Sequence, residues 1–477
     1  MQHYGSFYID GQWVDTPEAP RFTLINPADE QAFASISLGN VEHVNQAVRA
    51  ARRAFPAFSN TSKAERIALL ERIVQEFEAR ADQIMAAVSQ EMGAPRNMTA
   101  HTGTGIAAFK QAIVTLREYD FETLLGDNIV RREAIGVCGM ITAWNWPIQL
   151  IATKLAAALA AGCTVVWKPS EFTPLCALGL AEVMNAAGVP AGVFNLVNGD
   201  GPTVGNALCR HADVDMVSFT GSTRAGVQVA EAAAATVKRV SQELGGKSAN
   251  IILPDADLAA AARWNIARAF SNSGQSCHSP TRILVQQEQQ EELLQLLQQE
   301  CTKVKVGAPQ DPATTMGPVV NKAQFDRIQH YIQSGLDEGA RLLHGGVGRP
   351  QGLEHGYFIQ PTVFADVTPS MTIAREEIFG PVVAVLAYRD TDEAVEIAND
   401  SPYGLGGYIF SSDRRKALAI GARMQAGRIF YNGAPSNNVA PMGGYKQSGN
   451  GREMGVFGLE EYLEVKAMIG FENPMPA

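Results

Sequence analysis

An alternation of short apolar strands and helices, which begins near residue 135, restricts the fold of this chain more than any other feature. Each apolar run is four to nine residues long and is followed by a helical pattern. The order predicts a parallel sheet with helices on both faces, because strands buried on both sides read as continuous apolar runs. Such sheets bind ligands at the carboxyl ends of their strands. The predicted strands lie in residues 136–144, 164–168, 193–197 and 216–221, and the helices in 148–161, after Pro174, near Pro202 and in 223–235.

A second α/β region follows from about Ala249. Its predicted strands are 250–253, 282–285 and 381–388, and its predicted helices are 257–272 and 286–302. Residues 429–451 are rich in Gly, Asn and Pro, which indicates long functional loops. The chain has 477 residues, of which 46% are hydrophobic, so two or three domains are expected.

Two local patterns near the start of the chain also predict structure. Asp10-Gly11 lies between apolar stretches in residues 8–14, which is typical of a hairpin. Ser62 and Glu65 form a capping box at the start of an amphipathic helix predicted over residues 62–92.

Charge and cysteine content exclude several classes of protein. The net charge of −10 and the absence of a basic run argue against nucleic-acid binding. The N-terminus has no basic segment followed by an apolar core, so we expect no secretory signal. The longest apolar stretch, Leu155–Trp167, is shorter than the roughly 20 residues that span a bilayer. Six scattered cysteines without a CxxC predict a reduced, cytoplasmic protein with no metal site and no membrane partner.

Cys277 differs from the other five cysteines in its surroundings. It lies in the polar segment NSGQSCHSPTR, whereas Cys138, Cys163, Cys176, Cys209 and Cys301 lie in apolar or helical segments. Most lone cysteines are inert core residues. A polar, glycine-containing loop instead favours a reactive thiol at Cys277.

A thiol that performs acyl chemistry needs a donor for the oxyanion and a base for water. Asn145 closes the first predicted strand in TAWNWP, and its amide is a candidate donor; a local turn bond is the alternative. Glu243 ends an apolar strand in QELGGK and is a candidate base; an ordinary solvated glutamate is the alternative.

Three glycine-rich or charged turns follow strands and are candidates for binding phosphate and ribose. FTGSTRAG, which contains Gly221 and Ser222, opens a helix whose amides can face a pyrophosphate. WKPSE places Lys168 and Glu171 past another strand end. VNGDGPTVG is the weakest signal, because its glycines are spaced GxGxxxG. For each of the three, an ordinary βα turn is the alternative.

Taken together, these motifs resemble the aldehyde dehydrogenase superfamily, of the NAD(P)-dependent, hydrolytic, non-acylating type. The resemblance extends from FYIDGQWV near the N-terminus to EEYLEVK near the C-terminus. The motifs that carry it, in chain order, are TAWNWP, WKPSE, FTGS, QELGGK, GQSC and EEIFGP.

The resemblance implies a role for each matching residue. Cys277 is the nucleophile, Asn145 and the Cys277 backbone N–H form the oxyanion hole, and Glu243 activates the hydrolytic water. Lys168 and Glu171 bind the adenosine ribose, Gly221 and Ser222 border the pyrophosphate, and Glu377 binds the nicotinamide ribose. The full set of predicted cofactor-binding residues is Ile141, Trp144, Lys168, Glu171, Gly201, Gly221, Ser222, Leu244, Glu377 and Phe379.

The resemblance also implies three structural parts and an assembly. These are a doubly wound dinucleotide-binding domain (1–116 and 135–245), an α/β catalytic domain (246–445), and a small β oligomerisation arm with the C-terminal tail (117–134 and 446–477). The expected assembly is a homotetramer or homodimer, and the tail EEYLEVKAMIG has the pattern of an edge strand that adds to a neighbouring subunit.

The predicted reaction is oxidation of an aldehyde to a carboxylic acid with reduction of NAD, through a thiohemiacetal and a thioester on Cys277. Two rivals stay open: a coenzyme-A-acylating dehydrogenase, against which Glu243 argues, and a non-catalytic structural relative. His278, after the nucleophile, departs from the family pattern, as do Ala143 and Trp146. It is a candidate second base, but we favour a pocket-lining role.

The substrate is expected to be a neutral aliphatic or aromatic aldehyde, with a semialdehyde as the alternative. This rests on an aldehyde channel predicted without Arg or Lys, since a distal carboxylate would need a guanidinium. The predicted lining is Trp146, Ile148, Leu150, His278, Phe430, Tyr431 and Met442.

Overall fold

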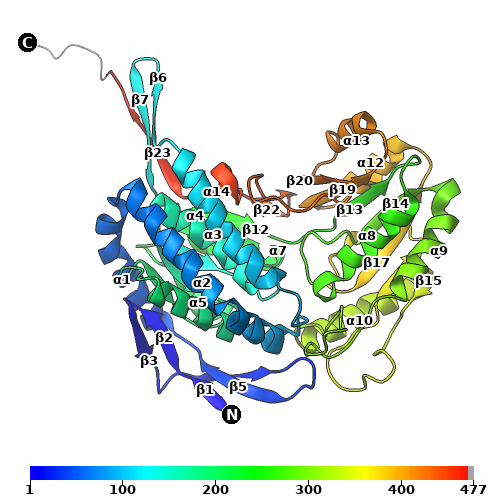
Figure 1. Cartoon of the computed structure of the whole chain (residues 1–477), viewed down its shortest axis with the longest axis horizontal. Helices are drawn as coiled ribbons and strands as arrows, with labels where there is room; N and C mark the ends of the chain where they lie inside the picture. The colour runs from blue at the N-terminus through cyan, green and yellow to red at the C-terminus, as the bar shows by residue number, and fades with distance from the viewer. Residues whose placement is uncertain (471–477) are drawn as a thin grey trace, which may run out of the picture.

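The predicted parallel strands lie side by side in an eight-stranded sheet of the computed structural model, which describes residues 1–470 (Figure 1). Five strands run parallel at its centre, and antiparallel strands close both edges. The order is β22 (Gly449–Asn450), β12 (Arg239–Glu243), β11 (Met216–Thr220), β8 (Val137–Ile141), β9 (Thr164–Lys168), β10 (Phe194–Leu196), β2 (Ser6–Ile9) and β3 (Gln12–Asp15).

Helices cover both faces of this sheet because successive strand residues point to opposite sides. On β9, Trp167 packs into one apolar cluster and Val166 into another. The first cluster contains α2 (Lys63–Met92), α3 (Ala100–Glu118), α4 (Pro147–Ala161) and α5 (Pro174–Ala186). The second contains α1 (Val41–Ser59), α6 (Asn206–Arg210) and α7 (Thr223–Ala234). The predicted doubly wound arrangement is therefore confirmed.

The second α/β region forms a seven-stranded sheet, parallel except at β15. Its order is β15 (Arg341–His344), β16 (Thr362–Ala365), β17 (Val382–Tyr388), β14 (Arg282–Gln286), β13 (Ala249–Ile252), β19 (Gly406–Phe410) and β20 (Arg428–Tyr431). One face packs against α8 (Leu258–Phe270) and α9 (Gln290–Cys301). The other packs against α10 (Lys322–Asp337), α12 (Thr391–Asn399) and α13 (Arg414–Gly421). The predicted loop segment 429–451 thus begins inside a strand, β20, which is a correction.

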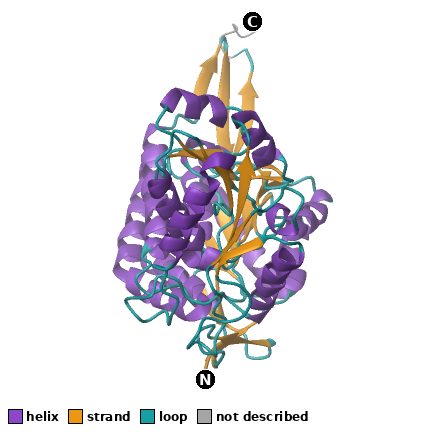
Figure 2. Cartoon of the chain, turned by 90° about the vertical axis from the view of Figure 1, so that its right-hand side faces the viewer, coloured by secondary structure: helices purple, strands orange, loops and turns teal. Residues whose placement is uncertain are grey.

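A three-stranded sheet projects from the body of the molecule (Figures 1 and 2). It consists of β6 (Glu122–Leu125), β7 (Asn128–Ala134) and β23 (Leu463–Met468). The predicted tail is divided: β22 joins the eight-stranded sheet, α14 (Gly455–Glu460) packs against α3 and α4, and β23 pairs with β7. Residues 471–477 of that tail lie outside the described residues.

The local predictions near the N-terminus are confirmed. Asp10 and Gly11 both have positive φ between β2 and β3. Ser62 and Glu65 form the reciprocal capping bonds of α2, which ends at Gly93. A small sheet of β1 (Gln2–Tyr4), β5 (Ala32–Ser37) and β4 (Arg21–Ile25) lies at the N-terminal end. In the part of the chain that the structure describes, no helix combines the length and apolar character needed to cross a membrane.

Candidate active site

Two glycines connect the sheets and bring their chemistry together. Gly245 and Gly246 link β12 to β13, and Gly246 N–H donates to Glu377 Oε1 at 2.9 Å. A Cβ on Gly245 would lie 2.4 Å from Glu377 Oε2, and one on Gly246 would lie 2.3 Å from the Cys277 carbonyl oxygen. At Gly246 the obstacle is backbone, so only glycine permits the approach, and at Gly245 a side chain would displace the Glu377 carboxylate.

A cavity of about 140 Å³ opens at this junction, beside the carboxyl ends of β8, β11 and β12. All three predicted catalytic residues line it, together with six of the ten predicted cofactor residues. The lining is Ala143, Trp144, Asn145, Thr220, Gly221, Ser222, Glu243, Leu244, Gly245, Cys277, Gln324, Arg327, Glu377 and Phe379.

The loop that carries Cys277 is fastened to Asn145. Between α8 and the loop, Asn272 has φ 55°, an uncommon left-handed conformation for a residue other than glycine. Its Nδ2 donates to the Asn145 carbonyl oxygen at 2.8 Å, and Asn145 Nδ2 donates to the Gln275 carbonyl oxygen at 3.2 Å. The Asn145 amide is buried, and one of its two N–H groups remains available to the cavity.

Burial and charge make the Cys277 thiol reluctant to ionise. Burial raises its pKa to about 12, and the charges of Glu377 and Glu243 act in the same direction. The other five cysteines are buried, as their apolar surroundings predicted, and Cys277 alone is partly exposed among the free cysteines of the described residues.

Glu243 is buried at the end of β12, with an exposed fraction of 3%, so it is not an ordinary solvated glutamate. Neither carboxylate oxygen has a hydrogen-bond partner within the described chain. Burial raises its pKa well above the usual range, and Glu453 adds to this shift. Lys154 pairs with Glu453 and with Ser218 rather than with Glu243. A buried carboxylate with open acceptor sites is suited to binding a water molecule.

The four remaining predicted cofactor residues lie outside this cavity, and contacts link three of them to one another. Lys168 Nζ lies 3.4 Å from Glu171 Oε2 at the end of β9, and Lys168 is paired with Ile141 at the end of β8. These three therefore form a second group at the carboxyl ends of β8 and β9, and Gly201 lies in the turn after β10.

His278 sits between Cys277 and Arg268 of α8. Arg268 Nη2 contacts His278 Nε2, and His278 Nδ1 lies 3.9 Å from Cys277 Sγ. A guanidinium only donates, so Nε2 accepts and Nδ1 carries the proton. Burial and the charges of Arg268 and Arg428 hold the pKa of His278 well below its usual range. The ring nitrogen that faces the thiol is thus protonated, which argues against a second base and favours the pocket-lining role.

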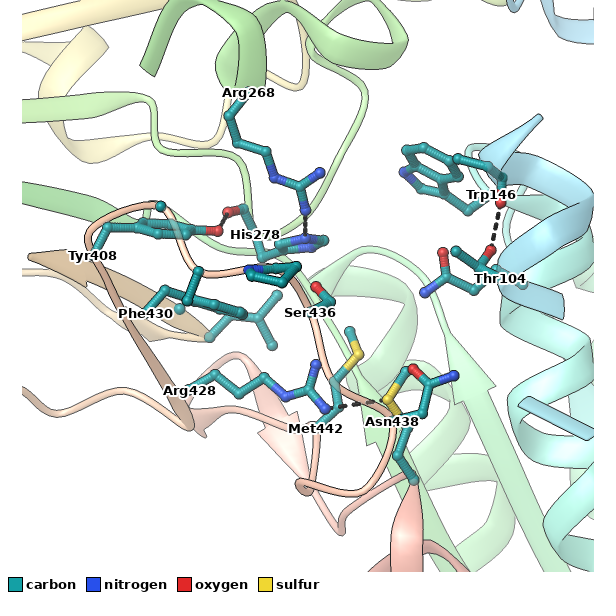
Figure 3. A pocket seen from close by; sticks show the side chains of 18 of the residues that line it. Thr104, Trp146, Arg268, His278, Tyr408, Arg428, Phe430, Ser436, Asn438 and Met442 are labelled. Carbon is teal, nitrogen blue, oxygen red and sulfur yellow. Dashed lines mark hydrogen bonds between the residues drawn. The ribbon is translucent and has the colours of Figure 1, made fainter. Parts of the chain in front are cut away.

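A larger cavity of about 320 Å³ lies on the other side of His278 (Figure 3). Of the seven predicted channel residues it contains Trp146, His278, Phe430 and Met442. The prediction is wrong for Ile148, Leu150 and Tyr431, which do not line this cavity. Consecutive residues of a helix or strand point in different directions, so a residue next to a lining residue need not line the cavity itself. On α4, Gln149 faces the cavity while Ile148 packs in the core; on β20, Phe430 faces the cavity while Tyr431 packs against the apolar cluster that contains α10, α12 and α13.

The prediction that no cation lines the channel is also wrong. Arg268 of α8 and Arg428 of β20 both reach the cavity (Figure 3). The alternation of β20 was a usable signal for Arg428, which lies two residues before Phe430 and therefore on the same face. No sequence pattern placed Arg268, since its position depends on how α8 packs beside the Cys277 loop.

The doubly wound sheet and the cysteine in the cavity at the carboxyl ends of its strands are typical of a class, the nucleotide-binding α/β oxidoreductases with a cysteine nucleophile. The chain belongs to the aldehyde dehydrogenase family, whose model matches residues 13–468. This confirms the predicted family, α/β fold class and enzyme class.

Similar proteins support the same assignment. A 3-succinoylsemialdehyde-pyridine dehydrogenase from a Pseudomonas species is 52% identical over 99% of this chain and all of that protein. The structure of a mutant aldehyde dehydrogenase C from Pseudomonas syringae, in complex with NAD+ and octanal, is 48% identical, covers 98% of this chain and 97% of that one, and has a TM-score of 0.97. A Mycobacterium tuberculosis aldehyde dehydrogenase complexed with NAD+ is 38% identical over 98% of each chain, with a TM-score of 0.95. These likenesses confirm the prediction of an aldehyde dehydrogenase that uses NAD.

The high pKa of the Cys277 thiol can be measured without substrate. In the cofactor-free protein, alkylation of Cys277 by iodoacetamide should accelerate about tenfold per pH unit from pH 7 to 9 and show no plateau by pH 10, because the thiolate is the nucleophile. Glu377→Gln removes a negative charge and should speed alkylation at pH 8. Glu376→Gln is the matched control, and peptide mapping by mass spectrometry identifies the site. A plateau below pH 9 would contradict the prediction.

Proposed function

We propose that this protein oxidises an aldehyde to a carboxylic acid through a covalent thioester on Cys277. The observation that carries the proposal is the single cavity lined by Cys277, Asn145 and Glu243 together with Glu377 and Phe379. It combines a nucleophile, an oxyanion donor and a candidate base within one enclosure, which is the set that acyl chemistry on a thiol requires.

In the first step the Cys277 thiolate attacks the aldehyde carbon. The carbonyl oxygen becomes an oxyanion, which the free N–H of the Asn145 amide and the Cys277 backbone N–H stabilise. Asn272 and Gln275 hold the Asn145 group in place beforehand, so little reorganisation is needed.

The residues present fit the cofactor. Gly221 offers no side chain, and Ser222 caps α7, whose N-terminal amides suit a pyrophosphate. Glu377 and Phe379 line the same cavity as Cys277 and would hold the nicotinamide end, while Lys168 and Glu171 would hold the adenosine ribose. When bound, NAD supplies the hydride acceptor for the thiohemiacetal carbon.

Glu243 completes the reaction as the base that deprotonates the hydrolytic water. Its two oxygens have no hydrogen-bond partner among the described residues, so a water molecule can bind there at no loss to existing bonds. A raised pKa brings a carboxylate closer to the range in which a base works well at neutral pH. The thioester then yields the acid and the free Cys277 thiol.

Two variants separate the steps. Cys277→Ala should lower turnover by at least about 1,000-fold with thermal stability and NAD binding retained, because only the covalent step is lost. Glu243→Gln should let the acyl-enzyme accumulate, which intact-protein mass spectrometry detects. Glu231→Gln, on the exposed face of α7, is the control. Turnover of Cys277→Ala within tenfold of wild type would overturn the proposal.

Glu171 is proposed to select NAD over NADP. A 2′-phosphate on the ribose would meet its carboxylate, and like charges at close range disfavour binding. The kcat/KM for NAD should exceed that for NADP by at least about tenfold. Glu171→Gln should reduce this ratio, whereas Glu182→Gln, exposed on α5, should leave it unchanged. Equal efficiency of the wild-type protein with both cofactors would refute the role.

For the substrate we retain a neutral aliphatic or aromatic aldehyde, with a semialdehyde as the alternative. Aromatic walls support the first: Tyr408 and Phe430 stack with centroids 5.1 Å apart, and Trp264 packs 5.0 Å from Tyr408. The octanal in the Pseudomonas syringae complex agrees with an apolar chain. The semialdehyde named in the Pseudomonas relative, and the two arginines, support the second.

We also propose a cytoplasmic homotetramer or homodimer that assembles through the three-stranded arm, with the three-part division of the chain given above. β23 pairs with β7 of its own chain, so a neighbouring subunit must contact its other edge or the faces of the sheet. Exposed apolar side chains gather on this arm and just after it, namely Leu124, Leu125, Val465 and Ile469. Such exposure favours a protein partner over water.

Charges placed on the arm should therefore dissociate the assembly. The variant Leu124→Glu with Val465→Glu should give monomers by light scattering, because each charge would have to be buried without a partner. Val237→Glu changes an even more exposed apolar residue away from the arm and should leave the oligomer intact. An unchanged oligomer in the double variant would refute the arm as the interface.

A further inference from the structure

The larger cavity contains positive charge without negative charge. Arg268 and Arg428 line it, and its lining includes no Asp or Glu. Within residues 1–470, neither arginine forms an ion pair with a carboxylate. Most ion pairs of this protein instead join side chains on its surface. A cation that faces an enclosed cavity without a counter-charge is a strong binding group for an acceptor.

The two arginines differ in how many donors they have free. Arg428 donates from Nε and Nη2 to the carbonyl oxygens of Asn437, Ala440 and Pro441, so its main contacts hold the loop that closes the cavity, and only its Nη1 group is without a hydrogen-bond partner among the described residues. Arg268 contacts His278 Nε2 and also lies against the Tyr408 hydroxyl. A guanidinium carries five N–H donors, so Arg268 keeps several that can bind a ligand.

The position of Arg268 relative to Cys277 also suits contact with a substrate. His278 is the residue after Cys277, and its ring bridges the sulfur and the guanidinium: Nδ1 is 3.9 Å from Cys277 Sγ while Nε2 contacts Arg268. The guanidinium thus lies one imidazole ring beyond the nucleophile. An acceptor a few bonds away from the aldehyde carbon can reach it.

The rest of the cavity wall is mainly apolar or aromatic, with four neutral polar side chains, Thr104, Gln149, Ser436 and Asn438. Trp146, Trp264, Tyr408 and Phe430 contribute their rings, and the Trp146 indole N–H is already bonded to Ser276 Oγ at 2.7 Å. The Tyr408 hydroxyl donates to the His278 carbonyl oxygen at 2.6 Å. These two donors are occupied, and Gln149, Ser436 and Asn438 are neutral. Arg268 is the charged donor of the wall that contacts the residue next to Cys277, so we take it as the main group for binding an oxygen of the substrate (Figure 3).

Resting on the proposed function, we infer that Arg268 is the specificity-determining residue of the aldehyde cavity, and that the preferred substrates carry a carbonyl or carboxylate oxygen a few bonds from the aldehyde, on an aliphatic or aromatic body. His278 holds the guanidinium in position, and the aromatic walls bind the body. This substrate class refines the neutral aldehyde proposed above, since a keto-aldehyde belongs to both.

Matched pairs of aldehydes test the inference. The pair 4-oxo-4-phenylbutanal and 4-phenylbutanal differs only in a keto oxygen, and succinate semialdehyde and butanal differ in a terminal carboxylate. For wild type, the kcat/KM ratio within at least one pair should exceed about tenfold in favour of the oxygen-bearing member. A ratio confined to the second pair assigns the acceptor as an anion, and a ratio in the first or in both assigns it as an oxygen acceptor of either charge.

Arg268→Met should reduce that ratio to below about threefold. Arg263→Met, which changes an exposed arginine on the same helix, should preserve it. Thermal unfolding checks that both variants fold. A second measurement is independent of turnover: the product acid 4-oxo-4-phenylbutanoate should bind Cys277→Ala at least about tenfold more tightly than it binds the Cys277→Ala, Arg268→Met double variant, as measured by calorimetry.

The failures are distinguishable. If Cys277→Ala still oxidises both members of a pair, the proposed function is wrong, whatever the ratio. If Cys277→Ala is inactive but the wild-type ratio is near one, or Arg268→Met preserves it, the role of Arg268 is wrong and the proposed function stands.

Discussion

The close approach permitted by Gly245 and Gly246 is the constraint on which the arrangement of this protein depends. The eight-stranded sheet presents the carboxyl ends of β8, β11 and β12 at the junction, whereas the seven-stranded sheet presents the amino ends of β13, β14 and β17, and the chain must cross between them without filling the space. A side chain at either glycine would overlap Glu377 or the Cys277 carbonyl oxygen. Because both are glycine, β12 can deliver Glu243 to the same cavity that the loop after α8 reaches with Cys277. The nucleophile and the candidate base belong to different sheets, and the link through Gly245 and Gly246 determines how close the two residues lie.

Burial at the link disfavours the ionised forms of both reactive groups. Burial is the first cause that raises the pKa of the Cys277 thiol to about 12 and the pKa of Glu243 well above its usual value. A neutral thiol is a poor nucleophile, so the ionisation of Cys277 is the step that burial opposes most directly. The fold tolerates Glu243 without hydrogen bonds because that same lack of partners leaves its oxygens open for water.

Much of the fold and of the candidate site could be predicted from the sequence, and the parts that could not be predicted have a physical reason. The strands β8, β9 and β11 were predictable because burial on both faces leaves continuous apolar runs, and Asn145, Glu243 and Cys277 because each closes or follows such an element in a distinct motif. Sequence adjacency failed for Ile148, Leu150 and Tyr431, which turn away from the cavity that their neighbours line. It also missed Arg268, whose place is set by the packing of α8, and the pairing of β23 with β7 in its own chain.

The charges around Cys277 are divided between its two sides. Glu243 and Glu377 lie in the smaller cavity and raise the thiol pKa, whereas Arg268 and Arg428 lie in the larger one and depress the pKa of His278. In the proposed reaction, this division of charge attracts the substrate at the beginning of turnover and repels the product at its end. An acceptor on the incoming aldehyde is drawn toward the arginines, so the cationic side governs which substrates enter. The new carboxylate forms at Cys277 on the side of Glu377, whose negative charge repels it, while Glu243 has taken up the proton of the hydrolytic water and is neutral at that point. Affinity for the distal part of the substrate therefore need not slow release of the acid, because the charge created by the reaction arises on the acidic side of the nucleophile.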